Sequence, residues 1–308
     1  MKHRLIFLFI LLSVCCTALF SGCSILAELE LDPDALAEIF NARPDTFSET
    51  APLLNVYVID CGQGDAILLL LPDGTTMLVD GSTQAEAEKV LDFLKRADIK
   101  RLDYVVATHP HEDHIGGLDD CINRYEVGAV YMPDATATTR AFDNLLTAIE
   151  KQNLSITVPE PGSYLIGSAD SSFSVQCLAP NQEQYPDTNN YSIVLRVVYG
   201  SRALLLTGDA ETLSEKEMLQ AGFELSADVL KLGHHGSSTS SSEEFLRAVD
   251  PEYAIASCGV DNSYGHPHRE TRTLLQQLNI AFFRTDTDGT VWIATDGQEL
   301  TVQAVGKS

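Results

Sequence analysis

The histidines of this 308-residue chain are grouped in a way that predicts a metal site. Of the eight histidines, all but His3 fall into three short segments, at 109–114, 234–235 and 266–268. Core packing gives no reason for such grouping, whereas zinc and manganese are commonly held by imidazole nitrogens together with carboxylate oxygens. We therefore expect these segments to bind divalent metal ions.

The densest group directly follows an apolar run that ends at Ala107. It supplies His109, His111, Asp113 and His114 within six residues. A loop at a strand end projects its side chains into a cleft, so three imidazoles and one carboxylate can surround two ions. His109 and His111 can face one ion while Asp113 and His114 face the other. The alternative is a solvated loop with chance histidines, but nothing in packing would place three imidazoles there.

This pattern resembles the signature of the metallo-β-lactamase superfamily, and two companion motifs follow the superfamily order. They are Val79-Asp80-Gly81 and Leu206-Thr207-Gly208-Asp209. The resemblance implies that Asp80 braces the metal-binding loop by hydrogen bonds and that Asp209 bridges both metals. It also implies an α/β fold, the four-layer αββα sandwich, in which two mixed sheets pack face to face with helices outside.

A closer resemblance is to the soluble hydrolase domain of the competence protein ComEC and to standalone exported proteins of that type. The motifs that carry it lie at 59–66, 189–195, 231–237 and 262–267, so together they span nearly the whole proposed domain. The resemblance implies an exported hydrolase that cleaves a phosphoester or phosphodiester with a metal-activated water.

Many superfamily members supply one more histidine between the first motif and Asp209, and this chain has none there. Asparagines at 189 and 190 occupy the corresponding region, as in the ComEC-like group. The first metal is therefore expected to bind His109, His111 and Asp209, with water or substrate filling the remaining positions. Fewer nitrogen and more oxygen ligands favour manganese over zinc, so the expected cofactors are two divalent ions, Zn or Mn.

The doubled histidine at 234 and 235 offers one metal ligand and one substrate contact. We assign His234 to the second metal, together with Asp113, His114 and Asp209. His235 would then face the substrate as a phosphate contact or proton donor, and the reverse assignment stays open.

Two metals that share a carboxylate can activate water and stabilise charge on the attacked phosphoryl group. Asp113 is expected to accept or orient the proton of that water. His266 is a further candidate for ligand or general acid, and a rigid surface loop before the next helix is the alternative. Lys231, Asn190 and Ser237 are candidate substrate contacts, with a solvated strand end as the alternative for Lys231.

Alternating apolar runs and amphipathic segments are expected to position these residues. Strands are predicted at 56–59, 66–71, 77–79, 102–107, 192–198, 203–206, 228–232, 254–257 and 291–294. Helical spacing of apolar residues predicts helices at 84–97, 138–151, 211–220, 243–249 and 269–278. This alternation indicates one α/β domain at 53–308 with helices covering the sheet faces.

The first residues have the layout of an export signal. A short basic stretch precedes an apolar run at 5–20, and Ser21-Gly22-Cys23 follows. Residues 1–23 resemble a bacterial lipoprotein signal with Cys23 as the lipidated residue, and an uncleaved membrane anchor is the alternative. We expect an acidic tether at 24–52, an extracytoplasmic domain anchored to the membrane by lipid, and no channel region. Four later cysteines are far apart and are expected to be buried free thiols: Cys61, Cys121, Cys177 and Cys258.

The net charge restricts the partners of this protein. Twenty Lys and Arg against 44 Asp and Glu give −24, which argues against a protein that coats nucleic acid. A metal centre can still meet one phosphate, because bound ions reverse the local sign of charge. The first candidate is a hydrolase acting on a small phosphoester or on nucleic acid. The second keeps the site but cleaves a lactone, thioester or amide. The third is a lipid-anchored binding component of a DNA-uptake or envelope assembly with vestigial hydrolysis.

Overall fold

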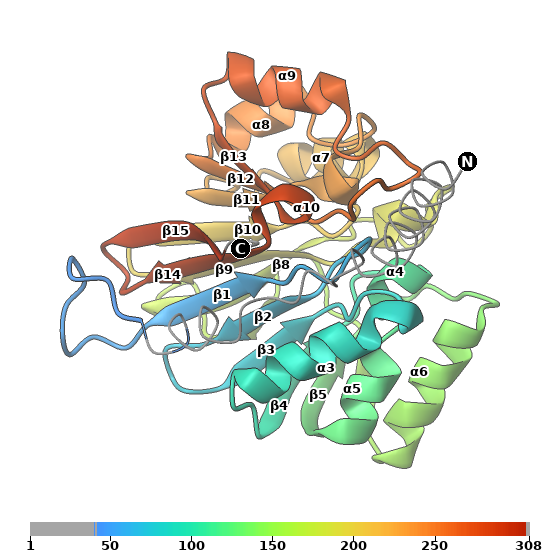
Figure 1. Ribbon diagram of the computed structural model, residues 1–308. Coiled ribbons are helices and arrows are strands. Elements are labelled where there is room, and N and C mark those ends of the chain that lie inside the picture. The colour runs from blue at the N-terminus through green and yellow to red at the C-terminus, as the bar shows by residue number, and fades with distance from the viewer. Residues whose placement is uncertain (1–39, 41, 306–308) are drawn as a thin grey trace, which may run out of the picture.

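Two mixed β-sheets pack face to face between two layers of helices in this computed structural model, which describes residue 40 and residues 42–305 (Figure 1). The eight-stranded sheet has the order β15-β14-β1-β2-β3-β4-β5-β6, and the seven-stranded sheet has the order β13-β12-β11-β10-β9-β8-β7. Helices α3, α5 and α6 cover the outer face of the first sheet, and α7, α8 and α9 cover that of the second (Figure 1). The α/β sandwich expected from the sequence is confirmed.

The first sheet draws its strands from both ends of the domain. Its bounds are β1 Leu54–Val58, β2 Ile67–Leu70, β3 Thr76–Val79, β4 Arg101–Val106, β5 Glu126–Tyr131, β6 Ile156–Thr157, β14 Thr290–Thr295 and β15 Leu300–Val305. Strands β3 to β6 run parallel to one another, whereas the pairs from β15 to β3 are antiparallel.

The second sheet is built from the middle and later part of the chain. Its bounds are β7 Tyr164–Ile166, β8 Phe173–Ala179, β9 Val194–Tyr199, β10 Arg202–Leu206, β11 Val229–Lys231, β12 Tyr253–Ala256 and β13 Ala281–Arg284. Strands β10 to β13 are parallel.

The helices connect these strands. They are α3 Ala87–Arg96, α4 Glu112–Ile115, α5 Leu118–Arg124, α6 Arg140–Lys151, α7 Thr212–Ala221, α8 Glu243–Val249, α9 Arg269–Gln277 and α10 Thr285–Asp288, with short 3-10 turns η1 Gln84–Glu86, η2 Thr188–Tyr191 and η3 Gly233–Gly236.

Alternation along the strands explains the layers. In β1, Val56 and Val58 belong to the apolar cluster between the sheets, while Tyr57 packs on the helix side. Successive side chains of a strand point to opposite faces, so a strand covered on both sides carries apolar residues at every position. Helix α3 completes the outer layer by burying Phe93 and Leu94, which lie on one face of the helix.

The functional residues follow the carboxyl ends of parallel strands. Strand β4 ends directly before the first histidine motif, and β10 ends directly before the motif that holds Asp209. The doubled histidine follows β11. Because the carboxyl ends of parallel strands meet at one edge of a sheet, the two sheets together place all three motifs at one edge of the sandwich.

The predicted signal at 1–23 and most of the predicted tether at 24–52 lie outside the described residues. The described end of the tether packs on the domain: Phe47 is only 5% exposed, and the ring of Phe40 lies 5.3 Å from the rings of Tyr57 and Phe93. The boundary at Leu53 therefore stays a prediction, although core packing begins before it.

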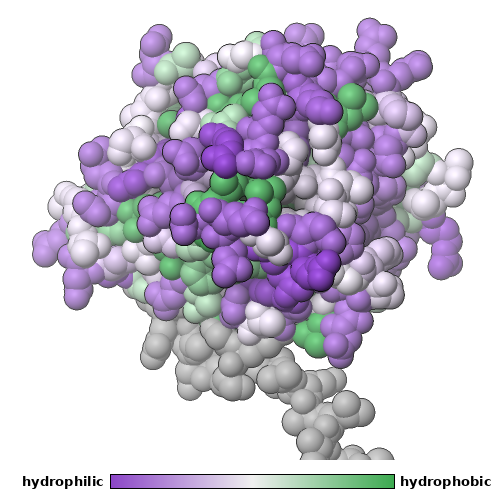
Figure 2. All heavy atoms as spheres, turned by 90° about the horizontal axis from the view of Figure 1, so that it is seen from above, coloured by the Kyte–Doolittle hydropathy of each residue, from purple (hydrophilic) through white to green (hydrophobic). Residues whose placement is uncertain are grey.

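Within residues 42–305, the four cysteines expected to be free thiols are buried and unpaired. No helix of this described part has the length and apolarity that a membrane crossing requires. The face seen from above in Figure 2 is mainly hydrophilic, with hydrophobic areas that are small and scattered.

Candidate metal centre

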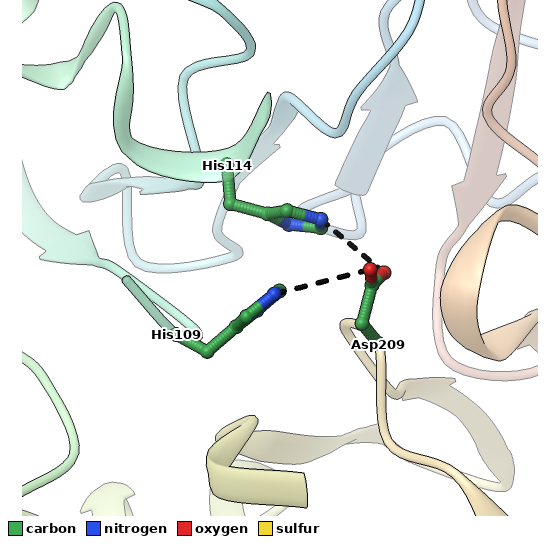
Figure 3. Close-up of side chains that lie close together, drawn as sticks. All are labelled: His109, His114 and Asp209. Atoms are coloured by element: carbon green, nitrogen blue, oxygen red, sulfur yellow. Dashed lines mark ion pairs between the residues drawn. The ribbon is translucent and has the colours of Figure 1, made fainter. Parts of the chain in front are cut away.

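His109 is fully buried, and its Nε2 atom faces Asp209 (Figure 3). Its other ring nitrogen, Nδ1, lies 3.1 Å from the Thr108 hydroxyl and 3.3 Å from the Ser192 hydroxyl. Nε2 lies 3.0 Å from Nδ1 of His111 and 3.9 Å from Oδ2 of Asp209. His109, His114 and Asp209 offer ligand atoms that all lie within 4.8 Å of one another and could hold an ion, and His111 lies beside this group.

His114, from helix α4, is buried between two carboxylates. Oδ2 of Asp80 lies 2.8 Å from Nδ1 of His114, and Asp80 also accepts hydrogen bonds from the amide and the hydroxyl of Thr108. Nε2 of His114 lies 3.2 Å from Oδ1 of Asp209. Asp80 thus fixes the ring and joins the histidine loop to the end of β3, leaving Nε2 directed at Asp209 (Figure 3).

His235 completes a second group of ligand atoms. Its Nε2 lies 3.2 Å from Oδ2 of Asp113 and 3.6 Å from Oδ2 of Asp209. Its Nδ1 lies 3.0 Å from a backbone carbonyl oxygen and 3.3 Å from Oδ1 of Asp65. Asp113, His114 and His235 each offer an atom within 4.8 Å of the others, so these three can hold a second ion.

His234 lies outside that second group and on the side of Glu211. Its Nδ1 is 3.2 Å from Oε1 of Glu211 and 3.3 Å from Nδ2 of Asn189, while its Nε2 is 3.8 Å from Oδ2 of Asp209. The structure places His235, and not His234, beside Asp113 at the second group, which is the reverse assignment that the sequence left open. Oδ2 of Asp209 is approached by Nε2 of His109, of His234 and of His235.

Backbone geometry explains why both histidines face the centre. Their φ angles are 47° at His234 and 55° at His235, inside the turn η3. Adjacent side chains of a strand point to opposite faces, whereas two successive left-handed residues turn the chain between them. Non-glycine residues adopt this conformation at a cost, and such strain concentrates at functional sites.

The donor set fits two divalent ions. Nε2 of His114 and Oδ1 of Asp209 are buried and make no hydrogen bond with any group that the structure describes. Buried polar atoms rarely stay unpaired, because desolvation without a partner costs free energy. A cation between these atoms would satisfy both of them, and Asp209 lies where its two oxygens can serve different ions.

Charges in the centre are strongly coupled. Burial alone would lower the pKa of His235, but the carboxylates of Asp209, Asp113 and Asp65 raise it to about 10. Burial works against the ionised form of Asp209, yet His114 and His235 hold its pKa well below the ordinary value. The metal-free protein therefore keeps protons on His114 and His235, which face these carboxylates, and a bound cation would replace those protons.

A cavity of about 320 Å³ opens onto these ligands. Its lining residues are Gln63, His111, Glu112, Asp113, Asn189, Asp209, His234, His235, Tyr264 and His266. Neither lysine nor arginine is among them, so positive charge for a bound phosphate would come from metal ions. His266 lies 5.2 Å from the ring of His234, and burial together with the nearby His235 and His234 lowers its pKa to about 4.

Three residues that we expected at the substrate lie elsewhere. Lys231 is 1% exposed and its Nζ lies 2.7 Å from Oδ2 of Asp65. The Asn190 carboxamide oxygen accepts hydrogen bonds from the amides of Glu211 and Ser214. The Ser237 hydroxyl accepts a hydrogen bond from the amide of Thr239. All three are buried and none lines the cavity, so their role here is to hold the loops that carry the ligands.

Sequence reasoning missed two carboxylates that orient histidines, Asp65 and Glu211. Asp65 belongs to the motif at 59–66, which indicated the family without assigning this residue a role. Glu211 follows Asp209 by two positions and carries no signal of its own. Both become visible only when their partners, His235 and His234, are placed beside them in space.

The family model described as the metallo-beta-lactamase superfamily matches residues 59–260, which include the first histidine motif, Asp209 and the doubled histidine. The chain belongs to the metallo-β-lactamase superfamily. Members of this superfamily normally bind metal ions, and the buried histidine and aspartate cluster could hold them. The sequence-based assignment of the family is confirmed.

Two metallo-β-lactamase relatives carry competence-protein names. The chain is 34% identical to "ComE operon protein 3" of Bacillus subtilis over 77% of this chain and 32% of that protein. It is 32% identical to "Competence protein ComA" of Neisseria gonorrhoeae over 82% of this chain and 34% of that protein. The chain thus corresponds to about a third of the length of these relatives.

Among solved structures, the fold is similar to that of CmlA, a diiron beta-hydroxylase from Streptomyces venezuelae. The TM-score is 0.52 at 15% identity, with 77% of this chain and 53% of that chain covered. This similarity supports the fold alone.

Proposed function

We propose that this protein is an exported dinuclear-metal hydrolase that cleaves a phosphoester or phosphodiester. The observation that carries the proposal is the position of Asp209 between two sets of imidazoles, with buried ligand atoms that make no hydrogen bond within the described chain. His109, His111, His234 and one oxygen of Asp209 would hold the first ion, and Asp113, His114, His235 and Asp209 the second. Zinc or manganese would suit these nitrogen and oxygen donors.

When bound, such a pair of ions supplies an activated water and withdraws charge from the phosphoryl group. The surrounding residues prepare the centre for this chemistry. Burial raises the pKa of Asp113, but the nearby His114 and His235 lower it by more. Asp113 therefore stays ionised. As an ionised acceptor in the cavity wall, Asp113 can orient the proton of the attacking water.

His266 is suited to a role on the substrate side. Its lowered pKa makes it neutral at physiological pH in the free protein. An anionic phosphoester beside it would raise that pKa and favour proton transfer to the leaving oxygen. His266 lines the cavity, and its ring contacts those of His234 and His235, which is compatible with this role.

Export and membrane attachment are part of the same proposal. The layout of residues 1–23 is that of a lipoprotein signal, with Cys23 as the lipidated residue and the extracytoplasmic side as the location. The competence names of the relatives favour a nucleic-acid or nucleotide substrate, whereas the charge of −24 favours a small one. The alternative function is a binding component of a DNA-uptake or envelope assembly with vestigial hydrolysis.

The test is hydrolysis of bis-p-nitrophenyl phosphate by the full chain after chelation and reconstitution with manganese or zinc. We expect metal-dependent turnover that Asp209→Ala abolishes, because both ions lose their shared ligand. Asp92→Ala, which removes an exposed carboxylate of α3, is the matched control and should retain activity. Bound metals without turnover would contradict phosphoester cleavage, and failure to bind metals would favour the binding component.

A further inference from the structure

Tyr264 stands at the rim of the metal cavity with its ring largely in solvent. It is 64% exposed, the largest fraction among the exposed large hydrophobic residues of the described chain. It nonetheless lines the same cavity as Asp113, Asp209 and His235. An exposed aromatic ring is ordinary on a protein surface, but one at the mouth of a catalytic cavity is available to a bound substrate.

The ring of Tyr264 is held in place without a ligand. It stacks on His266 with ring centroids 5.6 Å apart and an angle of 18° between the planes. His266 in turn stacks on His235 at 5.9 Å and 29°. The Asn262 side chain accepts a hydrogen bond from the His266 amide at 2.9 Å and donates to the His266 carbonyl at 2.7 Å. The surface is therefore preorganised, so that binding would cost little ordering entropy.

The spacing of this stack suits one nucleotide. Tyr264 stacks directly on His266, and His266 stacks on the metal-facing His235. In a nucleotide, the planar base is separated from its phosphate by one sugar. A phosphate at the metal centre would therefore leave its base near the exposed part of Tyr264, and stacking of bases on aromatic side chains contributes substantially to binding.

Gln63 adds a polar contact to this surface. Its Oε1 accepts a hydrogen bond from the Gly259 amide at 3.2 Å, whereas Nε2 has no partner within the described chain. Gln63 lines the cavity together with Tyr264. A buried amide donor without a partner would be satisfied by an acceptor on a ligand, and every nucleobase carries acceptors on its edge whereas a simple phenyl ring does not.

We infer that Tyr264 and Gln63 form a nucleobase subsite beside the metal centre. This rests on the proposed function and narrows its substrate to a nucleotide unit with an accessible base, as in a single strand or at a strand end. Among the described residues, neither lysine nor arginine lines the cavity, so contacts with an uncharged base can contribute affinity that further phosphate contacts there do not supply.

The experiment compares two esters that share one leaving group, thymidine 5′-(p-nitrophenyl phosphate) and methyl p-nitrophenyl phosphate, on the metal-loaded full chain. We expect a higher kcat/KM for the nucleoside ester. Tyr264→Ala should lower that kcat/KM by about 5- to 100-fold, mainly through KM, and leave the methyl ester within about twofold. Tyr264→Phe should retain the preference, because stacking needs the ring and not the hydroxyl, and Gln63→Leu should reduce it.

Val260→Ala is the matched control, since Val260 is 62% exposed on the same loop and does not line the cavity. Equal loss on both esters in Tyr264→Ala would overturn the base subsite in favour of a general aromatic contact. No effect on either ester would also overturn it while leaving phosphoester hydrolysis intact.

Binding of thymidine 5′-monophosphate, compared with inorganic phosphate, separates the two proposals when no ester is hydrolysed. Tighter binding of the nucleotide that depends on Tyr264 would keep the subsite and reject the hydrolytic function. Equal binding of both ligands would reject the subsite.

Discussion

Oxygen atoms hold Nδ1 of each imidazole that presents its Nε2 to Asp209. The partners of Nδ1 are Asp80 for His114, the Ser257 carbonyl for His235, Glu211 for His234, and the hydroxyls of Thr108 and Ser192 for His109. A hydrogen bond at one ring nitrogen fixes the tautomer and directs the other nitrogen to the metal. The orientation of four rings is therefore set before any ion arrives.

The residue scale yields a prediction for His234. Its Nε2 lies 3.8 Å from Asp209, and His235 rather than His234 lies beside Asp113, so His234 would take the place of the histidine that many superfamily members supply earlier in the chain. We expect His234→Ala to weaken binding of one of the two ions by at least about tenfold, because loss of a residue that only hydrogen-bonds to a metal ligand already has an effect of that size. Metal content after equilibrium dialysis and titration calorimetry measure it.

His266→Ala is the matched control for that experiment. It removes an imidazole from the same cavity, 5.2 Å from His234. His266 differs from the four oriented rings because its pKa is lowered and no carboxylate of the described chain forms an ion pair with it. His266→Ala should leave two ions bound. A His234→Ala protein that keeps both ions with unchanged affinity would assign His234 to the substrate instead.

At the scale of elements, the loop after β1 packs against the backbone of the histidine loop. The amide of Asp65 donates a hydrogen bond to the Asp113 carbonyl at 3.0 Å. Gly64 has a φ of +129°, and a Cβ there would lie 2.3 Å from that same carbonyl oxygen. Only glycine permits both the conformation and the approach.

We therefore expect Gly64→Ala to lower the free energy of unfolding by about 1–3 kcal/mol through backbone strain alone, with the clash adding to this loss. It should also weaken metal binding, because the clash displaces the backbone of Asp113. Gly74→Ala separates the two causes: Gly74 has a φ of +87° and open space around its Cβ position. Denaturant unfolding and metal titration measure both effects, and equal losses in the two variants would show that the contact with Asp113 is unimportant.

Most interior strands could be predicted from the sequence, because burial on both faces leaves a continuous apolar run such as that of β1 or β10. The four edge strands β6, β7, β13 and β15 were missed, and together they bury only one residue. Interior β5 and β8 were missed because Gly128 interrupts the first, and Ser174 and Gln176 the second. Which of His234 and His235 lies beside Asp113 could not be predicted, because it depends on a left-handed turn at two histidines, and histidine does not by itself indicate that conformation.

At the scale of the whole molecule, the metal centre joins contributions from both sheets. The first sheet carries the loops of Asp65 and His109, and the second carries those of Asp209 and the doubled histidine. Below the centre, Nζ of Lys231 lies 2.7 Å from Oδ2 of Asp65, with both side chains 1% exposed. This ion pair therefore links the two halves of the sandwich at the base of the site.

Loss of one partner of this pair should destabilise the entire domain. Asp65→Asn leaves the Lys231 ammonium buried without its counter-charge, so we expect the free energy of unfolding of the metal-free protein to fall by about 3–5 kcal/mol near neutral pH. The double variant Asp65→Asn with Lys231→Met should recover much of that loss, because neither charge is then buried. Urea unfolding of the chelated original chain, of Asp65→Asn and of the double variant measures these differences.

The pH dependence tests the cause of that loss. Burial raises the pKa of Asp65, but Lys231 and His235 outweigh burial and hold it below the ordinary value. A carboxylate with a lowered folded-state pKa stabilises the protein above its unfolded pKa, about 3.9, and that contribution disappears as the pH falls through the folded-state value. The difference in stability between the original chain and Asp65→Asn should therefore be constant near neutrality and shrink in strong acid, since both then carry an uncharged residue 65. A difference that persists unchanged into acid would mean that Asp65 acts through packing and hydrogen bonds, and that its charge does not join the two sheets.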